Sequence, residues 1–266
     1  MALALVRKLT GAVLTGVLAA LSAQAAEDIQ TLTTRPGVTE QVLVIHPTMP
    51  PVASAVLFVG GPGKAGLKTP WTPGRRGGNF LYHLADRFVA DGVLVALVDV
   101  PSDHSDGLWD WRTSREHATD IAAVIAALRA AAPLPVWLIG HSMGTLSAAS
   151  AAALLKTGGP DGIVLASSVT EKSRQSVETV RSAHLQDITV PVLLVHHEQD
   201  YCPASPYAGA ETVMDQLRNS RKHELMGFNG GATPKSGVCD SRAPHGYWGI
   251  GNKVVDAIVA WIKAAR

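Results

Sequence analysis

The chain has 266 residues, of which 47% are hydrophobic and 17% charged, with 23 Lys plus Arg against 22 Asp plus Glu. This composition excludes an intrinsically disordered chain, and a formal net charge of +1 without a basic run argues against a nucleic-acid partner. Two cysteines are too few for a disulfide scaffold or a thiolate zinc site, so we expect a globular enzyme or small-molecule binder.

The N-terminal segment has the three parts of a secretory signal peptide. Arg7 and Lys8 precede an uncharged apolar stretch over residues 9–21, and a small-x-small cleavage site ends at Ala25. We expect cleavage near Ala25, so that residues 1–25 are removed and the mature protein is periplasmic or secreted. A buried N-terminal helix is the alternative. No later stretch is long and apolar enough for a membrane span, so none is expected in the mature chain.

After this segment, short apolar runs alternate with helical patterns. Strands are expected over residues 41–45, 55–59, 93–98, 136–139, 162–166, 192–196 and 224–228. Helices are expected over residues 79–90, 114–131, 145–156, 206–217 and 251–264. This alternation predicts an α/β fold with a doubly wound, mostly parallel sheet. Without an internal repeat or a composition break, residues 26–266 are expected to form a single domain.

The strand expected over 136–139 is followed by Gly140-His141-Ser142-Met143-Gly144 and then by an Ala-rich helix. This is a G-x-S-x-G sequence between a strand and a helix, where a sharp turn lifts the serine hydroxyl above the sheet. Ser142 is therefore the candidate nucleophile. The alternative is a serine that merely caps the helix.

A serine hydroxyl needs a base and an orienting acid to act as a nucleophile at neutral pH. Asp200 begins the loop after the strand expected over 192–196, and His245 lies in the loop before the last helix. The chain order Ser142, Asp200, His245 is the order of triad members in α/β-hydrolases. Asp240 is a rival for the acid role, although it lies in the histidine loop itself.

On these motifs the sequence resembles the α/β-hydrolase superfamily, of the serine esterase or lipase type, over nearly all of the mature chain. The resemblance implies that Ser142 is the nucleophile, His245 the general base and then acid, and Asp200 the orienting carboxylate. It also implies an oxyanion hole in Gly60-Gly61-Pro62-Gly63, with the backbone N–H groups of Gly61 and Met143 as donors. A plain turn is the alternative for that loop.

The resemblance also bears on the cap and on cofactors. The family usually inserts its cap between the strands expected at 162–166 and 192–196, where only some two dozen residues stand here, so we expect little or no cap. No metal or organic cofactor is implied. His196, His197, Glu198 and Asp200 could be interpreted as a metal cluster, but adjacent residues of a strand point to opposite faces.

The two cysteines flank the acid and base loops. Cys202 follows Asp200 by two residues, and Cys239 precedes His245 by six. In an oxidising compartment we expect them to form a disulfide, with two free buried thiols as the alternative.

The sequence therefore predicts a serine hydrolase, expected to be a carboxylic ester hydrolase that forms an acyl-enzyme on Ser142 with a small-molecule ester substrate. A serine peptidase similar to prolyl aminopeptidases and a catalytically silent binding protein are the alternatives. No motif specifies an oligomeric state.

Overall fold

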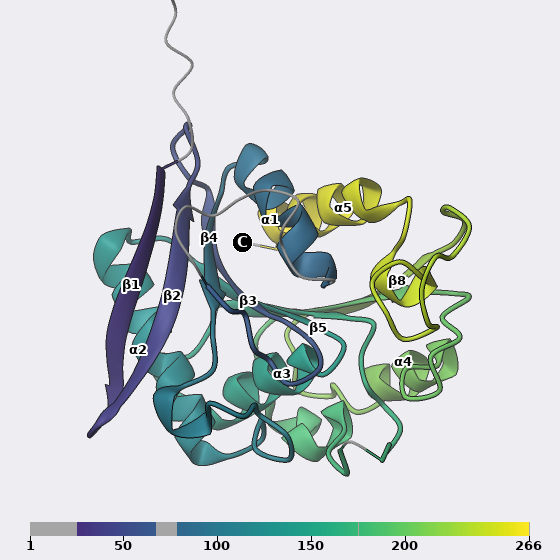
Figure 1. Ribbon diagram of the computed structural model, residues 1–266, viewed down its shortest axis with the longest axis horizontal. Coiled ribbons are helices and arrows are strands. Elements are labelled where there is room, and N and C mark those ends of the chain that lie inside the picture. Colours follow the sequence, from purple (N-terminus) through teal and green to yellow (C-terminus); the bar gives the residue numbers. More distant parts are fainter. Residues whose placement is uncertain (1–25, 68–78, 175, 266) are drawn as a thin grey trace, which may run out of the picture.

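The computed structural model describes residues 26–67, 79–174 and 176–265. The predicted signal peptide, residues 1–25, lies outside the described residues. One eight-stranded sheet runs through the molecule, with helices on both of its faces (Figure 1).

The strands of this sheet are β1 (Ala26–Arg35), β2 (Val38–His46), β3 (Ala53–Phe58), β4 (Val93–Val98), β5 (Val136–His141), β6 (Gly162–Ala166), β7 (Val192–His197) and β8 (His223–Phe228). The helices are α1 (Phe80–Ala90), α2 (Arg115–Ala131), α3 (Gly144–Leu154), α4 (Tyr207–Met214) and α5 (Gly251–Ala264). Short 3₁₀ turns lie at η1 (Ser102–His104), η2 (Val180–Ala183), η3 (Leu185–Asp187) and η4 (Pro244–Gly246).

The strand order is β1-β2-β4-β3-β5-β6-β7-β8. The β1–β2 and β2–β4 pairs are antiparallel, and the pairs from β4 to β8 are all parallel. The predicted α/β fold with a mostly parallel sheet is confirmed. Because β3, β5 and β7 run in the same direction, the loops that follow them emerge at one edge of the sheet, where ligands bind in open α/β sheets.

The buried side chains form one apolar cluster on each face of the sheet. One cluster packs side chains of α2, α3 and α4 against the strands, including Ile121 and Leu146. The other packs α1 and α5 on the opposite face, including Phe88 and Ile258 (Figure 1). The central strands are buried on both faces, which is why their sequences are continuous apolar runs rather than alternating ones.

Strand β1 was not predicted from the sequence. This strand pairs with β2 along the edge of the sheet, and most of its residues are exposed or half-buried. Its sequence is polar and carries no apolar run, so its pairing partner, rather than its own composition, makes it a strand. Pro36-Gly37 forms the turn between the two strands, with Gly37 at φ +75°, and this Pro-Gly pair was the available signal for a hairpin.

The connection between β6 and β7 carries no inserted domain among the described residues. Within 167–191, the described part contains only the turns η2 and η3, which pack against α3. The expectation of little or no cap is therefore confirmed for this connection.

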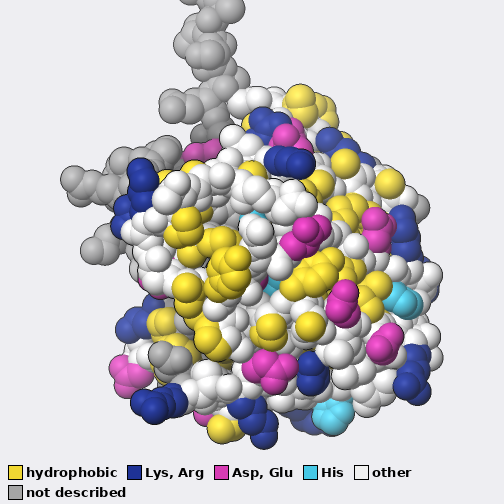
Figure 2. All heavy atoms as spheres, turned by 90° about the vertical axis from the view of Figure 1, so that its right-hand side faces the viewer, with side chains coloured by type: hydrophobic (Ala, Val, Ile, Leu, Met, Phe, Trp, Pro, Cys, Tyr) yellow, Lys and Arg dark blue, Asp and Glu magenta, His cyan; other side chains and the backbone are white. Residues whose placement is uncertain are grey.

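The face that carries β8 and α4 shows acidic, basic and apolar side chains intermingled (Figure 2). No helix in the described ranges is both long and apolar enough to cross a membrane.

Candidate active site

Ser142 occupies a strained turn between β5 and α3. Its φ is +55°, in the left-handed region that non-glycine residues rarely adopt. The turn is held by the Ser142 N–H, which donates to Ala166 O at 2.9 Å, and by Ser142 O, which accepts from the Thr145 N–H and hydroxyl. Strain of this kind persists only where the surroundings enforce it, and it is common at catalytic residues.

Glycines allow this turn to form beneath the β3 loop. A Cβ on Gly144 would lie 2.0 Å from Phe58 O, and one on Gly140 would lie 2.4 Å from Gly144 O. A Cβ on Gly60 would lie 2.8 Å from the Ser142 Cβ. The two glycines of the G-x-S-x-G sequence are thus required by backbone contacts, and Gly60 brings the β3 loop against the serine.

His245 and Asp200 form a buried hydrogen-bonded pair. His245 Nδ1 lies 2.8 Å from Asp200 Oδ2, and both side chains are at most 1% exposed. The carbonyl oxygen of His245 accepts from Ser167 Oγ at 2.8 Å and lies 2.9 Å from His141 Nε2. His245 Nε2 has no hydrogen-bond partner among the described residues. This arrangement fixes the ring and leaves Nε2 available as a proton acceptor.

The Asp200 carboxylate is surrounded by donors. Burial by itself raises the pKa of Asp200, but hydrogen bonds from His196 and His245 and from the Cys202 N–H outweigh burial and hold the pKa below its ordinary value. His196 Nε2 lies 3.5 Å from Asp200 Oδ2, and the Cys202 N–H donates to Oδ1 at 2.9 Å. Asp200 is therefore an ionised carboxylate at neutral pH, which suits the orienting role.

Ser142 and His245 line the same pocket, which has a volume of about 370 Å³ and is also lined by Gly60, Gly61 and Lys64. Within the described residues, the N–H groups of Gly61 and Met143 donate no backbone hydrogen bond. Met143 directly precedes the first residue of α3, whose N-terminus favours negative charge. Gly61 and the nucleophile candidate Ser142 therefore line one pocket, and Met143 directly follows Ser142 in the chain.

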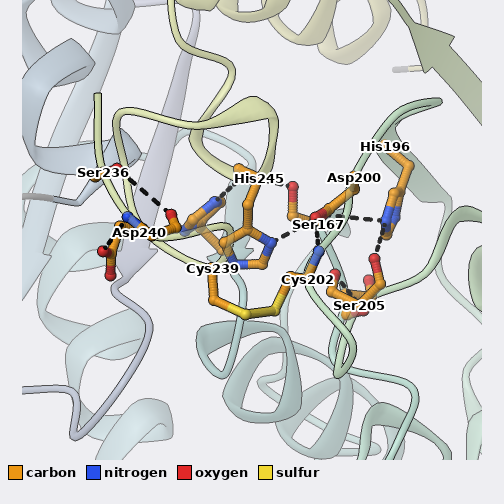
Figure 3. The surroundings of a disulfide bond; sticks show 12 residues. Ser167, His196, Asp200, Cys202, Ser205, Ser236, Cys239, Asp240 and His245 are labelled. Carbon is orange, nitrogen blue, oxygen red and sulfur yellow. Dashed lines mark hydrogen bonds and ion pairs between the residues drawn. A yellow bond between two sulfur atoms is a disulfide. The ribbon is translucent and has the colours of Figure 1, made fainter. Parts of the chain in front are cut away.

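The predicted disulfide is present. Cys202 and Cys239 are bonded, with their Cα atoms 4.7 Å apart, and they join the loop after β7 to the loop after β8. Figure 3 shows the bridge beside the His245 ring, with Asp200 and His196 on one side and Asp240 on the other. Cys202, one end of the disulfide, also donates its backbone N–H to Asp200. The disulfide is therefore linked to the acid directly through Cys202.

Breaking this bridge is expected to lower both stability and turnover. The double variant Cys202→Ser with Cys239→Ser removes a link across 37 residues, which stabilises by about 4 kcal/mol in the chain-entropy model. Turnover should fall further than unfolding explains, because a catalytic group displaced by about 1 Å can cost about 10²-fold in rate. The measurement is the melting temperature together with kcat assayed well below the melting transition, with and without reductant. Unchanged kcat after complete reduction would leave the bridge a purely structural role.

The rival residues contact other groups. Asp240 is exposed, and its carboxylate accepts from the Gly237 N–H at 3.0 Å. His196 Nε2 lies 2.9 Å from Ser205 O, whereas His197 Nε2 lies 2.9 Å from Gly230 O. The two histidine rings therefore bond different segments of the chain, and within the described residues no group of His, Cys, Asp and Glu has the arrangement of a metal site.

The contacts of the side chains that hold the acid and base were not predicted from the sequence. Ser167, at the end of β6, and His196, at the end of β7, contact His245 and Asp200 respectively. Asn79 lies 3.4 Å from His141 Nδ1, which leaves His141 Nε2–H to donate to His245 O. Polar residues at the carboxyl ends of neighbouring parallel strands were the available signal, since those ends meet at one edge.

Two buried histidines are expected to make stability strongly pH-dependent. Burial, aided by the Arg112 charge, lowers the pKa of His117 to about 3, and burial, aided by His245, lowers the pKa of His141 to about 3. Between an unfolded pKa of about 6.5 and this value, the folded state binds fewer protons than the unfolded chain. The free energy of unfolding should therefore fall with decreasing pH, by up to about 1.4 kcal/mol per pH unit for each histidine.

Urea unfolding at pH values from 7.5 to 4.5 measures the slope of the free energy of unfolding against pH. His117→Gln should reduce the slope, and His223→Gln, at an exposed position of β8, controls for the substitution itself. A slope that His117→Gln leaves unchanged would show that His117 is not one of the groups responsible.

Comparisons with known proteins agree with the observed fold. The family model described as serine aminopeptidase, S33, matches residues 77–184. An α/β serine hydrolase homologue from Coxiella burnetii is 15% identical, with 88% of this chain and 97% of that chain covered and a TM-score of 0.62. A thermostable carboxyl esterase from Bacillus coagulans is 15% identical, with 90% and 99% covered and a TM-score of 0.62.

An α/β serine hydrolase without a lid from Xanthomonas campestris is also 15% identical, with 90% and 93% covered and a TM-score of 0.56. A search of curated protein sequences found no match. At these identities the structural likenesses show the fold.

Proposed function

We propose that this chain, which belongs to the α/β-hydrolase superfamily, is a serine hydrolase that cleaves carboxylic esters through an acyl-enzyme on Ser142. In the proposed mechanism, the Ser142 hydroxyl attacks the ester carbonyl carbon while His245 Nε2 accepts its proton. His245 then delivers the proton to the departing alcohol. The same imidazole activates a water molecule that releases the acid and restores the serine.

The observation that carries the proposal is the orientation of His245. Its Nδ1 is bound by a buried, ionised carboxylate, and its Nε2 is unpartnered among the described residues at a pocket that Ser142 also lines. A carboxylate at Nδ1 selects the tautomer with a free Nε2 lone pair and stabilises the imidazolium that forms when the serine proton is accepted. The negative charge that develops on the carbonyl oxygen is proposed to be stabilised by hydrogen bonds from the N–H groups of Gly61 and Met143.

The pocket supports small ester substrates. A volume of about 370 Å³ is near the lower end of the range for ligand pockets, and its lining includes small and polar residues such as Gly60 and Ser241. The short connection between β6 and β7 leaves this side of the pocket without a covering domain in the described residues. Esters with short acyl chains are therefore the expected substrates.

The description of the matching family model favours peptide hydrolysis as a second candidate. An aminopeptidase must bind the α-amino group of its substrate, and Asp240 places a carboxylate at the rim of the same pocket. The Ser142, His245 and Asp200 chemistry is common to both reactions, so the leaving group distinguishes them.

The proposed site of action is outside the cytoplasm. The bond between Cys202 and Cys239 supports an oxidising compartment, where disulfides persist. Together with the signal-peptide pattern of residues 1–25, this supports export of the mature chain.

Labelling and substrate screening test the proposal. A fluorophosphonate probe should label the wild-type protein and should not label Ser142→Ala. The screen uses p-nitrophenyl acetate, butyrate and octanoate beside aminoacyl-p-nitroanilides, and the highest kcat/KM is expected for the shorter esters. Faster cleavage of an anilide would select the peptidase, and the absence of labelling and turnover would indicate a silent binding protein.

A further inference from the structure

A fully buried arginine lies behind the loop that carries Gly61. Arg112 belongs to the loop between β4 and α2, and only 1% of its surface is exposed. Its Nη2 donates to Val59 O at 3.1 Å and to Gly61 O at 3.0 Å, and its Nη1 donates to Ser147 Oγ at 2.8 Å. The guanidinium therefore connects the end of β3 to α3, the helix that follows Ser142.

Burying the positive charge of Arg112 in the interior costs free energy. Burial lowers the pKa of Arg112 to about 10, and the nearby Glu178 carboxylate opposes this effect, so the guanidinium stays protonated at neutral pH. Within the described residues its hydrogen bonds go to two carbonyls and a hydroxyl, and none goes to a carboxylate. Burying a cation among neutral partners costs free energy, because burial removes its hydration. Such an arrangement is expected only where the partners depend on the cation for their position.

The two carbonyls that Arg112 binds flank the peptide that carries the Gly61 N–H. Val59 O belongs to the preceding peptide and Gly61 O to the following one. Between them, Gly60 O accepts from the Gly63 N–H at 3.2 Å, so the 60–63 segment is a tight turn with Gly61 at φ +56°. In a planar trans peptide the C=O and N–H point in opposite directions, so the Gly61 N–H points away from the turn.

Two adjacent glycines would otherwise leave this turn free to move. Glycine has the widest backbone freedom of any residue, and Gly60 and Gly61 have no side chains that could fix the peptide between them. The loop around Arg112 supplies the restraint, since the Leu108 N–H also donates to Pro62 O at 2.9 Å. A Cβ on Gly63 would lie 2.8 Å from Arg112 Nη2, so the guanidinium occupies the space that a larger residue would fill.

We propose that Arg112 is a positioning residue for the oxyanion hole: it fixes the Gly60–Gly61 peptide by holding both neighbouring carbonyls, and it places a permanent positive charge behind the developing oxyanion. The inference rests on the proposed function, because it acts through the N–H of Gly61. A donor fixed in advance stabilises the transition state without reorganisation, whereas the bound ester gains little from it. Arg112 should therefore affect kcat far more than KM.

Steady-state kinetics of Arg112→Met and Arg112→Lys test this inference with the best ester of the screen. We expect Arg112→Met to lower kcat by about 10²-fold with KM changed less than about threefold, as for loss of one oxyanion donor. Arg112→Lys keeps the charge but is shorter and has no planar fork, so its kcat should lie between those of Arg112→Met and the wild type.

A pair of ketone inhibitors separates this role from a general structural one. An alkyl trifluoromethyl ketone adds to the serine and presents an oxyanion, whereas the matching methyl ketone binds without an adduct. The Ki of the trifluoromethyl ketone should rise in Arg112→Met in step with the loss of kcat, and the Ki of the methyl ketone should stay constant. A purely structural defect would raise both Ki values together, which would overturn the inference.

Two controls match the arginine variants. Ser147→Ala removes the Nη1 partner but leaves both carbonyl contacts, so kcat should stay near the wild-type value. Arg129→Met removes another arginine that holds two loop carbonyls, those of Gly158 and Gly159, on a different part of the molecule. Circular dichroism and thermal melting confirm folding, and Arg112→Lys decides the question if Arg112→Met does not fold.

The possible failures are distinguishable. Wild-type kcat in either folded Arg112 variant, while the wild-type protein hydrolyses esters, overturns the role of Arg112 alone. Absence of turnover and of fluorophosphonate labelling in the wild-type protein overturns the proposed function and this inference together.

Discussion

Replacing Ser142 with alanine is expected to lower kcat by about 10⁶-fold, as removal of a triad nucleophile does in serine hydrolases. The Ser142 hydroxyl is the proposed site of the acyl-enzyme, and direct attack by water would lose the advantage of a nucleophile held in place by the protein. The fold should be retained, because the φ of +55° strains an alanine about as much as a serine and the turn is held by backbone groups of Ala166 and Thr145.

The measurement is kcat of the purified variant, with its melting temperature to establish that it is folded. Ser150→Ala is the matched control, because Ser150 is a buried serine of α3, the helix that follows this turn. Retention of a tenth of the wild-type turnover by Ser142→Ala would remove Ser142 from the mechanism. His245→Ala should be about as damaging, since the members of a triad act as a unit.

Replacing Asp200 with asparagine is expected to lower kcat by about 10⁴-fold. The carboxylate accepts from His245 Nδ1 at 2.8 Å, and an asparagine amide that donates to Nδ1 would select the tautomer with its proton on Nε2. A ring protonated at Nε2 cannot accept the Ser142 proton. The loss should appear in kcat rather than in KM, because Asp200 does not line the pocket.

Asp240→Asn is the matched control for this prediction. Asp240 does line the pocket, but it is exposed and its described side-chain contact is with the Gly237 N–H. Its replacement should lower kcat by less than about tenfold, because His245 Nδ1 is bound by Asp200 and would keep its orientation. A larger loss for Asp240→Asn than for Asp200→Asn would show that the orienting acid is wrongly assigned.

The sequence predicted most of the fold well, but it did not predict the edge strand β1. Strands β2 to β8 and the five helices correspond to expected elements, because buried parallel strands are continuous apolar runs and helices show their period. The helix expected over 206–217 is shorter in the structure, Tyr207–Met214, and β1 was not expected at all. Both lie at the periphery, where burial imposes no strong pattern on the sequence.

For the candidate site, the sequence by itself determined the residues that local motifs mark. Ser142 is indicated by its flanking glycines. Asp200 and His245 are indicated by their positions in loops that follow strands, and by the chain order Ser142, Asp200, His245. The cysteine pair was indicated by the expected compartment. These features are local in sequence or follow from topology alone, so they could be predicted without coordinates.

The tertiary structure alone decided which polar groups support that site. Arg112 lies 51 residues from Gly61 along the chain yet donates to its carbonyl, and Ser167 lies 78 residues from His245 yet holds its backbone. Asp200, rather than Asp240, is the acid that reaches His245 Nδ1. Each of these contacts depends on two loops meeting at an angle and distance set by packing, and hydrogen bonds are sensitive to fractions of an ångström. No local pattern encodes that geometry, which is why only the folded chain reveals it.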